Sequence, residues 1–472
     1  MRWLYVSFGS VHRHLQVRCL RRRMRFLQIL AAFPVLWLAV GCGATSGTQK
    51  SSSPGSPSPG IPQPVAPGPP GQGIPPEYFG LNLHPGVLNG NIPWPTIPFG
   101  SVRLWDTGTA WAQINTSEGV YDFSVLDNWL NLSAANGKTD FLYVFGVVPP
   151  WASSDPSDPS CVSNVRPAGS CDPPSDLNAD GSGTDQFWQD FVRAIVTHAA
   201  GKIKYWEIWN EPDVPSEWSG TMAQMSRMAQ DAYSIIKSVD PNAMVTTPTP
   251  VNDGEGAQTI GGWMSRYFAG SRGNFADIVT FHGYVDAGHG KPVEDIGSIV
   301  DTVDRHRLGA LAAKPLWDTE SSWGKDADFP DPDLQAAFLA RDYLLHWSNG
   351  VERFYWYQYG NTQSGTLLSD AGITLAGIAY EQVYDWMVGA TMPKACSAAG
   401  SVWTCDLTKP EGIQEQAVWD TAQSCSNGNC TTSKYTPDTT YTKYADLAGN
   451  LTSFTPGTAV PIGAKPILLE NQ

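Results

Sequence analysis

The chain has 472 residues, and its 45 Asp and Glu outnumber its 30 Lys and Arg, so the formal net charge is −15. An excess of negative charge repels phosphate backbones and anionic lipid headgroups, which argues against nucleic-acid binding and against electrostatic attachment to a membrane. The length fits one (β/α)8 barrel with a small companion domain.

The N-terminal part of the chain has the features of an export signal. A cluster of arginines at 21–25 precedes an apolar run, 26–40, that is too short to span a membrane stably. We therefore interpret residues 1–41 as a signal peptide, with Met24 as an alternative start. The sequence Leu-Ala-Val-Gly-Cys that ends at Cys42 resembles a bacterial lipoprotein cleavage site, so Cys42 is the candidate lipid anchor. The alternative is a signal that is cleaved without lipid attachment and a secreted protein.

Residues 42–76 are rich in Ser, Gly and Pro and lack the apolar side chains needed to fold, which predicts a semi-extended tether. Six cysteines follow it in two clusters, and their even number in an exported chain predicts disulfides. One is expected between Cys161 and Cys171. Two more are expected within the C-terminal four, and the sequence leaves their pairing open. These four are Cys396, Cys405, Cys425 and Cys430.

From residue 77 the chain repeats one unit, a short β-rich run, then a polar or Gly/Pro break, then a stretch with helical periodicity. The eight β-rich runs are Tyr78–His84, Ser101–Trp105, Phe141–Val147, Ile203–Asn210, Ala243–Thr247, Ile278–His282, Pro315–Glu320 and Arg353–Gln358. Clear helices are predicted at Thr184–Ala199, Thr221–Val239, Asp333–Trp347 and Leu375–Met387. The pattern predicts an α/β fold, a parallel (β/α)8 TIM barrel over 77–389, with its reactive groups at the C-terminal ends of the strands.

The last part of the chain, 390–472, has a different pattern. Short alternating runs are separated by Gly, Pro, Asn and Thr, which predicts a small C-terminal all-β, sandwich-like accessory domain. The runs are Ser401–Leu407, Gln416–Asp420, Thr440–Ala445 and Pro466–Glu470. So small a domain needs its disulfides or contact with the barrel for stability, and structural support is its expected role.

Two carboxylates lie at the ends of the fourth and seventh runs. Glu211 closes the sequence Tyr-Trp-Glu-Ile-Trp-Asn-Glu, and Glu320 closes Leu-Trp-Asp-Thr-Glu. Strands four and seven of a closed barrel face each other across its mouth, so the topology brings the two side chains together. Hydrolysis of a glycosidic bond with retention needs such a pair about 5 Å apart, one as the acid and one as the nucleophile. Asp318 and Asp326 are nearby rivals for the place of Glu320.

These motifs resemble those of the clan A glycoside hydrolases. Within that clan, the sequence Tyr-Trp-Glu-Ile-Trp-Asn-Glu-Pro-Asp and the trailing β-module resemble glycoside hydrolase family 39, whereas Leu-Trp-Asp-Thr-Glu-Ser-Ser-Trp departs from that family's strand-seven motif. The resemblance covers 77–389 and, more weakly, the tail. It implies that Glu211 is the acid/base, that Asn210 binds the sugar 2-hydroxyl, and that Glu320 is the nucleophile.

The same resemblance assigns further side chains to the substrate site. It implies that Arg103, at the end of the second run, keeps the nucleophile ionised and that His282 and Tyr284 lie next to it. It implies that the Trp356 ring forms a platform under the sugar. Each has a simpler explanation, namely a structural ion pair for Arg103, for which Glu207 is the expected partner inside the barrel, a scaffold hydrogen bond for His282, and packing for the two aromatic rings.

Two further residues at run ends, His84 and Trp151, are candidate subsite residues or packing residues. The long loop 151–180, pinned by the expected disulfide, is the best candidate for shaping the substrate groove. In the accessory domain, carbohydrate binding by Trp403 or Trp419 is the alternative to structural support.

The sequence thus predicts a retaining O-glycosyl hydrolase that acts on a β-linked oligo- or polysaccharide, xyloside-like or an exopolysaccharide. An endo-β-glucanase or mannanase-type enzyme, a transglycosylase, and a non-catalytic surface carbohydrate-binding protein are the alternatives. No metal or other cofactor is expected, because two carboxylates suffice. The expected protein is a monomer of the bacterial cell envelope, in contact with the membrane only through the lipid on Cys42.

Overall fold

The computed structural model describes residues 72–163, 166–251, 260–269, 275–426 and 428–471. The expected signal peptide, the anchor at Cys42 and nearly all of the tether lie outside the described residues. Among the described residues, no helix is both long enough and apolar enough to cross a membrane.

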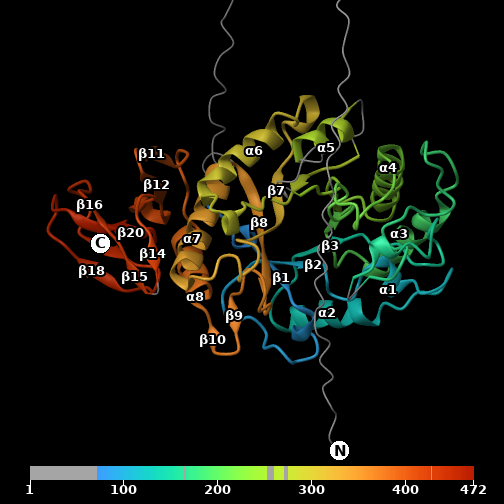
Figure 1. Cartoon of the computed structure of the whole chain (residues 1–472), viewed down its shortest axis with the longest axis horizontal. Coiled ribbons are helices and arrows are strands. Elements are labelled where there is room, and N and C mark those ends of the chain that lie inside the picture. The colour runs from blue at the N-terminus through green and yellow to red at the C-terminus, as the bar shows by residue number, and fades with distance from the viewer. Residues whose placement is uncertain (1–71, 164–165, 252–259, 270–274, 427, 472) are drawn as a thin grey trace, which may run out of the picture. The chain divides into compact units, whose positions relative to one another are not determined.

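Eight parallel strands form one curled sheet in the order β5-β4-β3-β2-β1-β8-β7-β6 (Figure 1). Isolated bridges between Thr246 and Ile278 and between Val251 and His282 join β5 to β6 and close the barrel. Each strand falls within or overlaps one of the eight β-rich runs, so the predicted barrel is confirmed. The strands are β1 Phe79–Leu83, β2 Ser101–Leu104, β3 Phe141–Val144, β4 Tyr205–Glu207, β5 Met244–Val245, β6 Val279–Phe281, β7 Leu316–Ser321 and β8 Val351–Tyr359.

The helices lie outside the sheet and are positioned by their caps and apolar faces. In α4, Thr221 caps the first turn through its side chain and Gln224 closes the capping box. The helices are α1 Trp111–Ile114, α2 Ser124–Ala135, α3 Gln186–Ala199, α4 Met222–Val239, α5 Ile260–Tyr267, α6 Ile296–Asp304, α7 Pro332–Ser348 and α8 Leu375–Met387. Short 3-10 helices span Pro76–Tyr78, Pro85–Val87, Pro159–Cys161, Ala287–His289, Val293–Asp295, Gly309–Leu311 and Pro410–Gly412.

Side chains fill the barrel interior in layers. Tyr205, Trp317 and Tyr355 pack together in one buried cluster, and the guanidinium of Arg353 lies over the first two rings. Because side chains alternate along a strand, the next inward position on β4 is Glu207. The interior therefore changes from aromatic rings packed around Arg353 to the buried carboxylate of Glu207 toward the C-terminal ends of the strands.

The C-terminal part forms a six-stranded sheet in the order β11-β12-β13-β20-β17-β18, with antiparallel neighbours, and a two-stranded second layer. The six strands are β11 Ser397–Ala399, β12 Val402–Thr408, β13 Gln414–Asp420, β20 Ile467–Glu470, β17 Lys443–Ala445 and β18 Leu451–Ser453. The other pairs are β16 Ser433–Tyr435 with β19 Val460–Ile462, β14 Cys425–Ser426 with β15 Asn429–Cys430, and, before α8, β9 Leu368–Ser369 with β10 Gly372–Ile373.

The six-stranded sheet is apolar on both faces. Val418 and Leu469 belong to a core shared with β19, whereas their neighbours Trp419 and Leu468 belong to the main core of the barrel. Figure 1 shows α7 and α8 on the side of the barrel that faces this sheet. Every residue of α7 from 335 to 348 is buried, because β8 packs on one side of the helix, α6 and α8 flank it, and Cys425 of β14 and Ala464 of the C-terminal part cover Ala337.

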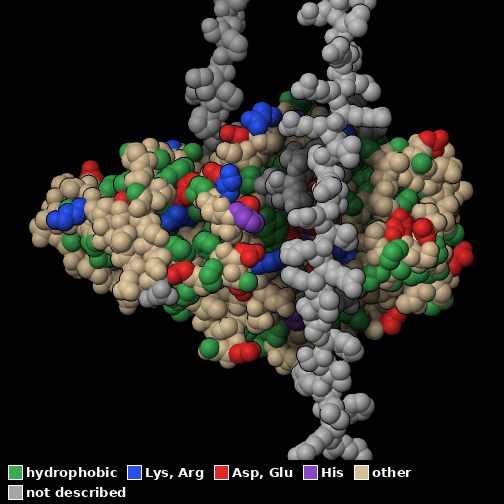
Figure 2. Space-filling model, in the orientation of Figure 1, with side chains coloured by type: hydrophobic (Ala, Val, Ile, Leu, Met, Phe, Trp, Pro, Cys, Tyr) green, Lys and Arg blue, Asp and Glu red, His purple; other side chains and the backbone are tan. Residues whose placement is uncertain are grey.

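The three expected disulfides are present. Cys161 pairs with Cys171, and the C-terminal four pair as Cys396–Cys405 and Cys425–Cys430. Disulfides of this kind are typical of exported proteins. Acidic side chains are spread over the surface, and several gather over the side of the barrel that carries α1 and α3 (Figure 2).

Candidate active site

Arg103 lies at the centre of the barrel mouth and is fully buried. Its Nη2 and Nε atoms donate to the two carboxylate oxygens of Glu207 at 2.7 and 3.3 Å, and its Nη1 atom donates to Oε2 of Glu320 at 2.6 Å. Further bonds reach Oδ1 of Asn82 at 3.1 Å and Oδ1 of Asn210 at 2.8 Å. One guanidinium thus connects strands β1, β2, β4 and β7.

The charge of Arg103 is matched by the carboxylates around it. Burial alone would lower the pKa of Arg103, but the carboxylates of Glu207 and Glu320 raise it. The expectation that Glu207 is its partner inside the barrel is confirmed by their ion pair. Two carboxylates beside the buried guanidinium compensate its charge, and such pairing is what makes charged groups tolerable in a barrel interior.

Glu320 reaches the mouth because β7 contains a bulge. Asp318 pairs with Phe354 and Ser321 with Trp356, so three residue steps on β7 span two on β8. Residues two apart on a regular strand share a face. The extra residue breaks this rule, so that Glu320 points inward to Arg103 while Asp318 points to His346 of α7.

Glu320 is held by donors on both oxygens. Oε2 accepts from Arg103, and Oε1 accepts from the hydroxyl of Tyr284 at 2.9 Å. Burial raises the pKa of Glu320, and the charge of Arg103 opposes the rise. Two donors on a carboxylate favour its ionised form, which is the form that can attack carbon.

Glu211 leaves the end of β4 in a left-handed conformation with φ 45°, and its backbone N–H donates to the carbonyl of Thr249 at 2.8 Å. Non-glycine residues adopt such φ values rarely, and mostly where the surroundings hold them there. Oε1 of Glu211 lies 2.9 Å from Nδ1 of His282.

The tautomer of His282 follows from its two neighbours. Its Nε2 atom lies 3.3 Å from Nη2 of Arg103, whose two N–H groups make their shorter bonds to Glu207 and Asn210. A guanidinium has no acceptor, so the Nε2 atom that faces it carries the lone pair and not a proton. Nδ1 then carries the hydrogen and donates it to Glu211. Burial lowers the pKa of His282 to about 4, so the ring is neutral in this arrangement.

A carboxylate oxygen of Glu211, a carboxylate oxygen of Glu320 and a ring nitrogen of His282 all lie within 4.8 Å of one another. Such a triplet can in principle surround a metal ion. Here the imidazole nitrogen that faces Glu211 carries a proton, and Arg103 supplies positive charge to Glu320. The arrangement therefore suits two carboxylates that act on a neutral substrate better than it suits the binding of a metal cation.

The structure does not bring Trp356 to the mouth, so the expected sugar platform is wrong. Its ring is fully buried on the outer face of β8, against Trp323 and Tyr343, and its Nε1 donates to the carbonyl of Gly365 at 2.8 Å. The side chain that points into the mouth is that of Tyr357, one residue later. The alternation of β8, in which Tyr355 faces the interior, could have identified it.

His84 and Trp151 lie outside the hydrogen-bonded network. His84 caps a turn, accepting from the backbone N–H of Gly86 at 3.0 Å. Trp151 donates to the carbonyl of Asn115 at 2.8 Å and packs edge-on against Phe187. Both therefore have the structural contacts that the simpler explanation expects.

The rival carboxylates of Glu320 lie elsewhere. Asp326 accepts from Nε1 of Trp323 at 2.8 Å and also bonds to Thr366, which anchors the loop after β7. Asp318 faces α7, as described above. Neither side chain is in the network of Arg103.

Besides Asn82 and Tyr357, three side chains near the mouth were not singled out from the sequence, namely Asp106, Arg166 and Glu217. Asp106, with φ 57°, accepts from the Tyr357 hydroxyl at 2.9 Å and lines a hollow of about 180 Å³ beside Trp105. Arg166 lines the same hollow and forms an ion pair with Glu217. Burial raises the pKa of Glu217 to about 8 even though Arg166 opposes the rise.

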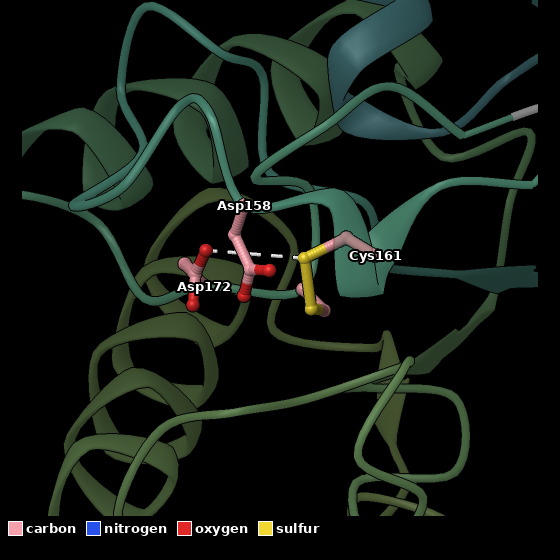
Figure 3. Close-up of side chains that lie close together, drawn as sticks. Asp158, Cys161 and Asp172 are labelled. Carbon is pink, nitrogen blue, oxygen red and sulfur yellow. Dashed lines mark hydrogen bonds between the residues drawn. A yellow bond between two sulfur atoms is a disulfide. The ribbon is translucent and has the colours of Figure 1, made fainter.

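A second cluster, Asp158, Cys161, Cys171 and Asp172, has the residue types of a metal site (Figure 3). Its two sulfurs form a disulfide, so they offer no thiolate. The 3.8 Å approach of Cys161 Sγ to Asp172 Oδ2 is a contact rather than a hydrogen bond, because a disulfide sulfur has no proton. The cluster serves to pin the loop 151–180.

The comparisons agree with this geometry. The family model described as "Glycosyl hydrolase catalytic core" matches residues 181–380, a range that includes Glu211 and Glu320. The comparison with curated proteins gave no match. Among solved structures, the chain is similar to a family 39 glycoside hydrolase from Bacteroides cellulosilyticus WH2, with a TM-score of 0.60 and 18% identity over 84% of this chain and 81% of that one.

Two further solved structures have the same fold. One is a monomeric β-xylosidase from Caulobacter crescentus CB15, with a TM-score of 0.56 and 14% identity over 85% of this chain and 97% of that one. The other is a glucosidase from Croceicoccus marinus, with a TM-score of 0.55 and 16% identity over 86% of this chain and 98% of that one.

The family match shows that residues 181–380 are similar to the catalytic core of glycosyl hydrolases, and the solved structures show the same barrel fold. Its barrel fold is similar to that of the family 39 enzyme and of the two other glycosidases, in agreement with the resemblance of the strand-four motif.

Proposed function

We propose that the protein is a retaining β-glycosidase in which Glu211 is the acid/base and Glu320 the nucleophile. The observation that supports this most directly is the approach of their carboxylate oxygens to within 4.8 Å. Retaining enzymes keep the two carboxyl groups about 5 Å apart, whereas inverting enzymes need about 6.5–9.5 Å to admit a water molecule between one carboxylate and the sugar.

In the first step, Oε1 or Oε2 of Glu320 attacks the anomeric carbon as the bond to the leaving oxygen breaks. Glu211 gives its proton to that oxygen, and a glycosyl ester of Glu320 forms. Two carboxylates this close cannot both ionise without repulsion, which favours a proton on Glu211 while Arg103 holds the charge of Glu320.

In the second step, a water molecule enters beside Glu211. The Glu211 carboxylate takes a proton from this water as the water oxygen attacks the anomeric carbon. The ester bond breaks and Glu320 leaves as a carboxylate. Two inversions give net retention. His282 donates Nδ1–H to Glu211 in both steps and so fixes the orientation of the carboxyl group.

Asn210 is proposed to bind the sugar. Its Oδ1 accepts from Arg103, so the amide Nδ2 is the end that remains to donate to a substrate hydroxyl. A hydrogen bond from Nδ2 to the oxygen of the hydroxyl next to the anomeric carbon orients that hydroxyl, whose own proton becomes the better donor as positive charge develops on the ring. Asn210 therefore positions the sugar at the cleavage point.

The first substrates to test are β-xylosides and β-glucosides, because the proteins of similar fold include a β-xylosidase and a glucosidase. We further propose that the enzyme acts outside the cytoplasm, held to the membrane by a lipid on Cys42 or released after cleavage of the signal.

The test uses the full-length protein and its Cys42→Ser variant on aryl β-xylosides and β-glucosides, with the anomer of the first product followed by NMR. The proposal expects a β-configured first product, and an α-configured one would refute it. Glu320→Gln should lose at least about a thousandfold in kcat. Glu211→Gln should lose most on substrates with poor leaving groups and least on dinitrophenyl glycosides, which need no acid. Glu381→Gln, an exposed carboxylate on α8, is the matched control.

A further inference from the structure

Asp318 lies on the same strand as Glu320, β7, but its side chain has a different environment. It is fully buried at the outer wall of the barrel, where it faces α7. Burial of a carboxylate without partners costs free energy, so the hydrogen bonds that Asp318 makes indicate its role in the fold.

The two oxygens of Asp318 bind two separate pieces of backbone. Oδ1 accepts from the backbone N–H of Glu320 at 3.2 Å, and this bond closes the bulge that turns Glu320 inward. Oδ2 accepts from the backbone N–H of Gly283 at 3.0 Å. Gly283 stands between His282, which contacts Glu211, and Tyr284, which contacts Glu320. One carboxylate therefore holds the nucleophile and the neighbours of both catalytic groups.

Gly283 is required for this contact. A Cβ atom at this position would lie 2.4 Å from Oδ2 of Asp318, closer than atoms that are not bonded to each other can approach. Glycine is thus the residue that lets the segment after β6 reach the carboxylate.

Asp318 is itself fixed from α7. Its Oδ2 lies 2.9 Å from Nε2 of His346, and Nδ1 of His346 lies 2.9 Å from the backbone carbonyl and 3.0 Å from the carboxylate of Asp342. Burial alone would lower the pKa of His346, but Asp342 and Asp318 raise it to about 10. The ring also stacks on Phe354 at 4.0 Å between centroids. A rigid, charged imidazolium therefore orients Asp318.

We propose that Asp318, oriented by His346, is a positioning residue that sets the separation of Glu211 and Glu320. It does so through the backbone of Glu320 and through the His282–Tyr284 segment, and it touches no substrate. The inference rests on the proposed roles of Glu211 and Glu320 but concerns how their geometry is maintained. A displacement of about 1 Å at reacting groups costs about a hundredfold in rate.

The kinetic test compares Asp318→Asn with Asp342→Asn. Both remove one buried negative charge next to His346, but only the first leaves the backbone N–H groups of Glu320 and Gly283 with one acceptor oxygen in place of two, because the amide presents an NH2 group in place of the other. Asp318→Asn should lower kcat about 10- to 100-fold with KM within about twofold of wild type. Asp342→Asn should keep kcat within about threefold of the wild-type value, even if its melting temperature falls as far as that of Asp318→Asn. Parallel losses of kcat and melting temperature in both variants would overturn the proposal.

A structural readout keeps this test separate from the proposed reaction. Crystal structures of the wild type and of Asp318→Asn should show the Glu211 and Glu320 oxygens within 4.8 Å in the first and farther apart in the second. An unchanged separation overturns the positioning role even if the enzyme is active. If Asp318→Asn does not fold, Gly283→Ala displaces the same carboxylate from the other side and is held to the same two criteria. Failure of the wild type to cleave any glycoside would instead refute the proposed function.

Discussion

Asp318 and Glu320 lie two residues apart on one strand and point to opposite sides of the barrel wall. The bond from the backbone N–H of Glu320 to Oδ1 of Asp318 spans the bulge between them. The polar centre of the enzyme is thus connected to helix α7 through the strand that carries the nucleophile.

Arg103 should be essential for both stability and catalysis. Arg103→Met keeps the length of the side chain but leaves Glu207 buried without a counter-charge, which costs about 3–5 kcal/mol. We expect this loss in urea unfolding at neutral pH. The double variant Arg103→Met/Glu207→Gln should recover part of the stability and none of the activity. Equal stability of Arg103→Met and wild type would show that the ion pair is not needed for folding.

The acid limb of the pH–activity profile should report Glu320. Burial raises the pKa of Glu320 above its ordinary value of 4.5, and the nucleophile works only when ionised, so kcat/KM should fall as the pH drops through this raised pKa. Tyr284→Phe removes a donor to the ionised form and should move the limb upward by about half a pH unit. Tyr435→Phe in β16 of the C-terminal part is the matched control. If the acid limb of Tyr284→Phe coincides with that of the wild type, the hydrogen bond from Tyr284 to Glu320 is absent in the free enzyme.

His346 should make stability depend on pH. The pKa of His346 is raised to about 10 in the folded state, above the ordinary 6.5. A raised pKa contributes stability that is complete below pH 6.5 and is lost as the pH rises toward 10. The difference in unfolding free energy between wild type and His346→Gln should therefore shrink between pH 6.5 and 9.5, by at most about 1.4 kcal/mol per pH unit. A constant difference over that range would mean that His346 is neutral.

Trp419 should stabilise the accessory sheet rather than bind carbohydrate. It is fully buried, stacks on Trp403, and donates Nε1–H to Glu294 at 2.8 Å, while Arg341 of α7 pairs with the same glutamate. Trp419→Phe leaves that carboxylate short of a donor and should cost about 1–3 kcal/mol in unfolding experiments. Retention on insoluble polysaccharide should not change. Loss of retention with unchanged stability would restore the carbohydrate-binding alternative for this surface.

The sequence predicted the elements and failed where local geometry departs from regular periodicity. The eight strand runs and the pairing of Arg103 with Glu207 follow from alternation and topology alone. The bulge at Asp318–Ser321 adds one residue to a strand of period two, and a pattern of residue types does not contain it. The resemblance assigns Trp356 to the mouth, whereas its ring lies on the outer face of β8, and the run, aromatic on both faces, does not by its composition distinguish the two. The contacts of Asp318 with Gly283 and His346 join segments far apart in the chain, which only the folded structure brings together.

The most direct measurement of the catalytic assignment is the site of covalent labelling. The enzyme would be incubated with a dinitrophenyl 2-deoxy-2-fluoro-β-glycoside, whose fluorine slows the second step so that the glycosyl ester accumulates. Mass spectrometry of the digested protein should then find one added fluoroglycosyl group, on Glu320. Attachment to another carboxylate, or release of an α-configured product with no adduct, would contradict the account.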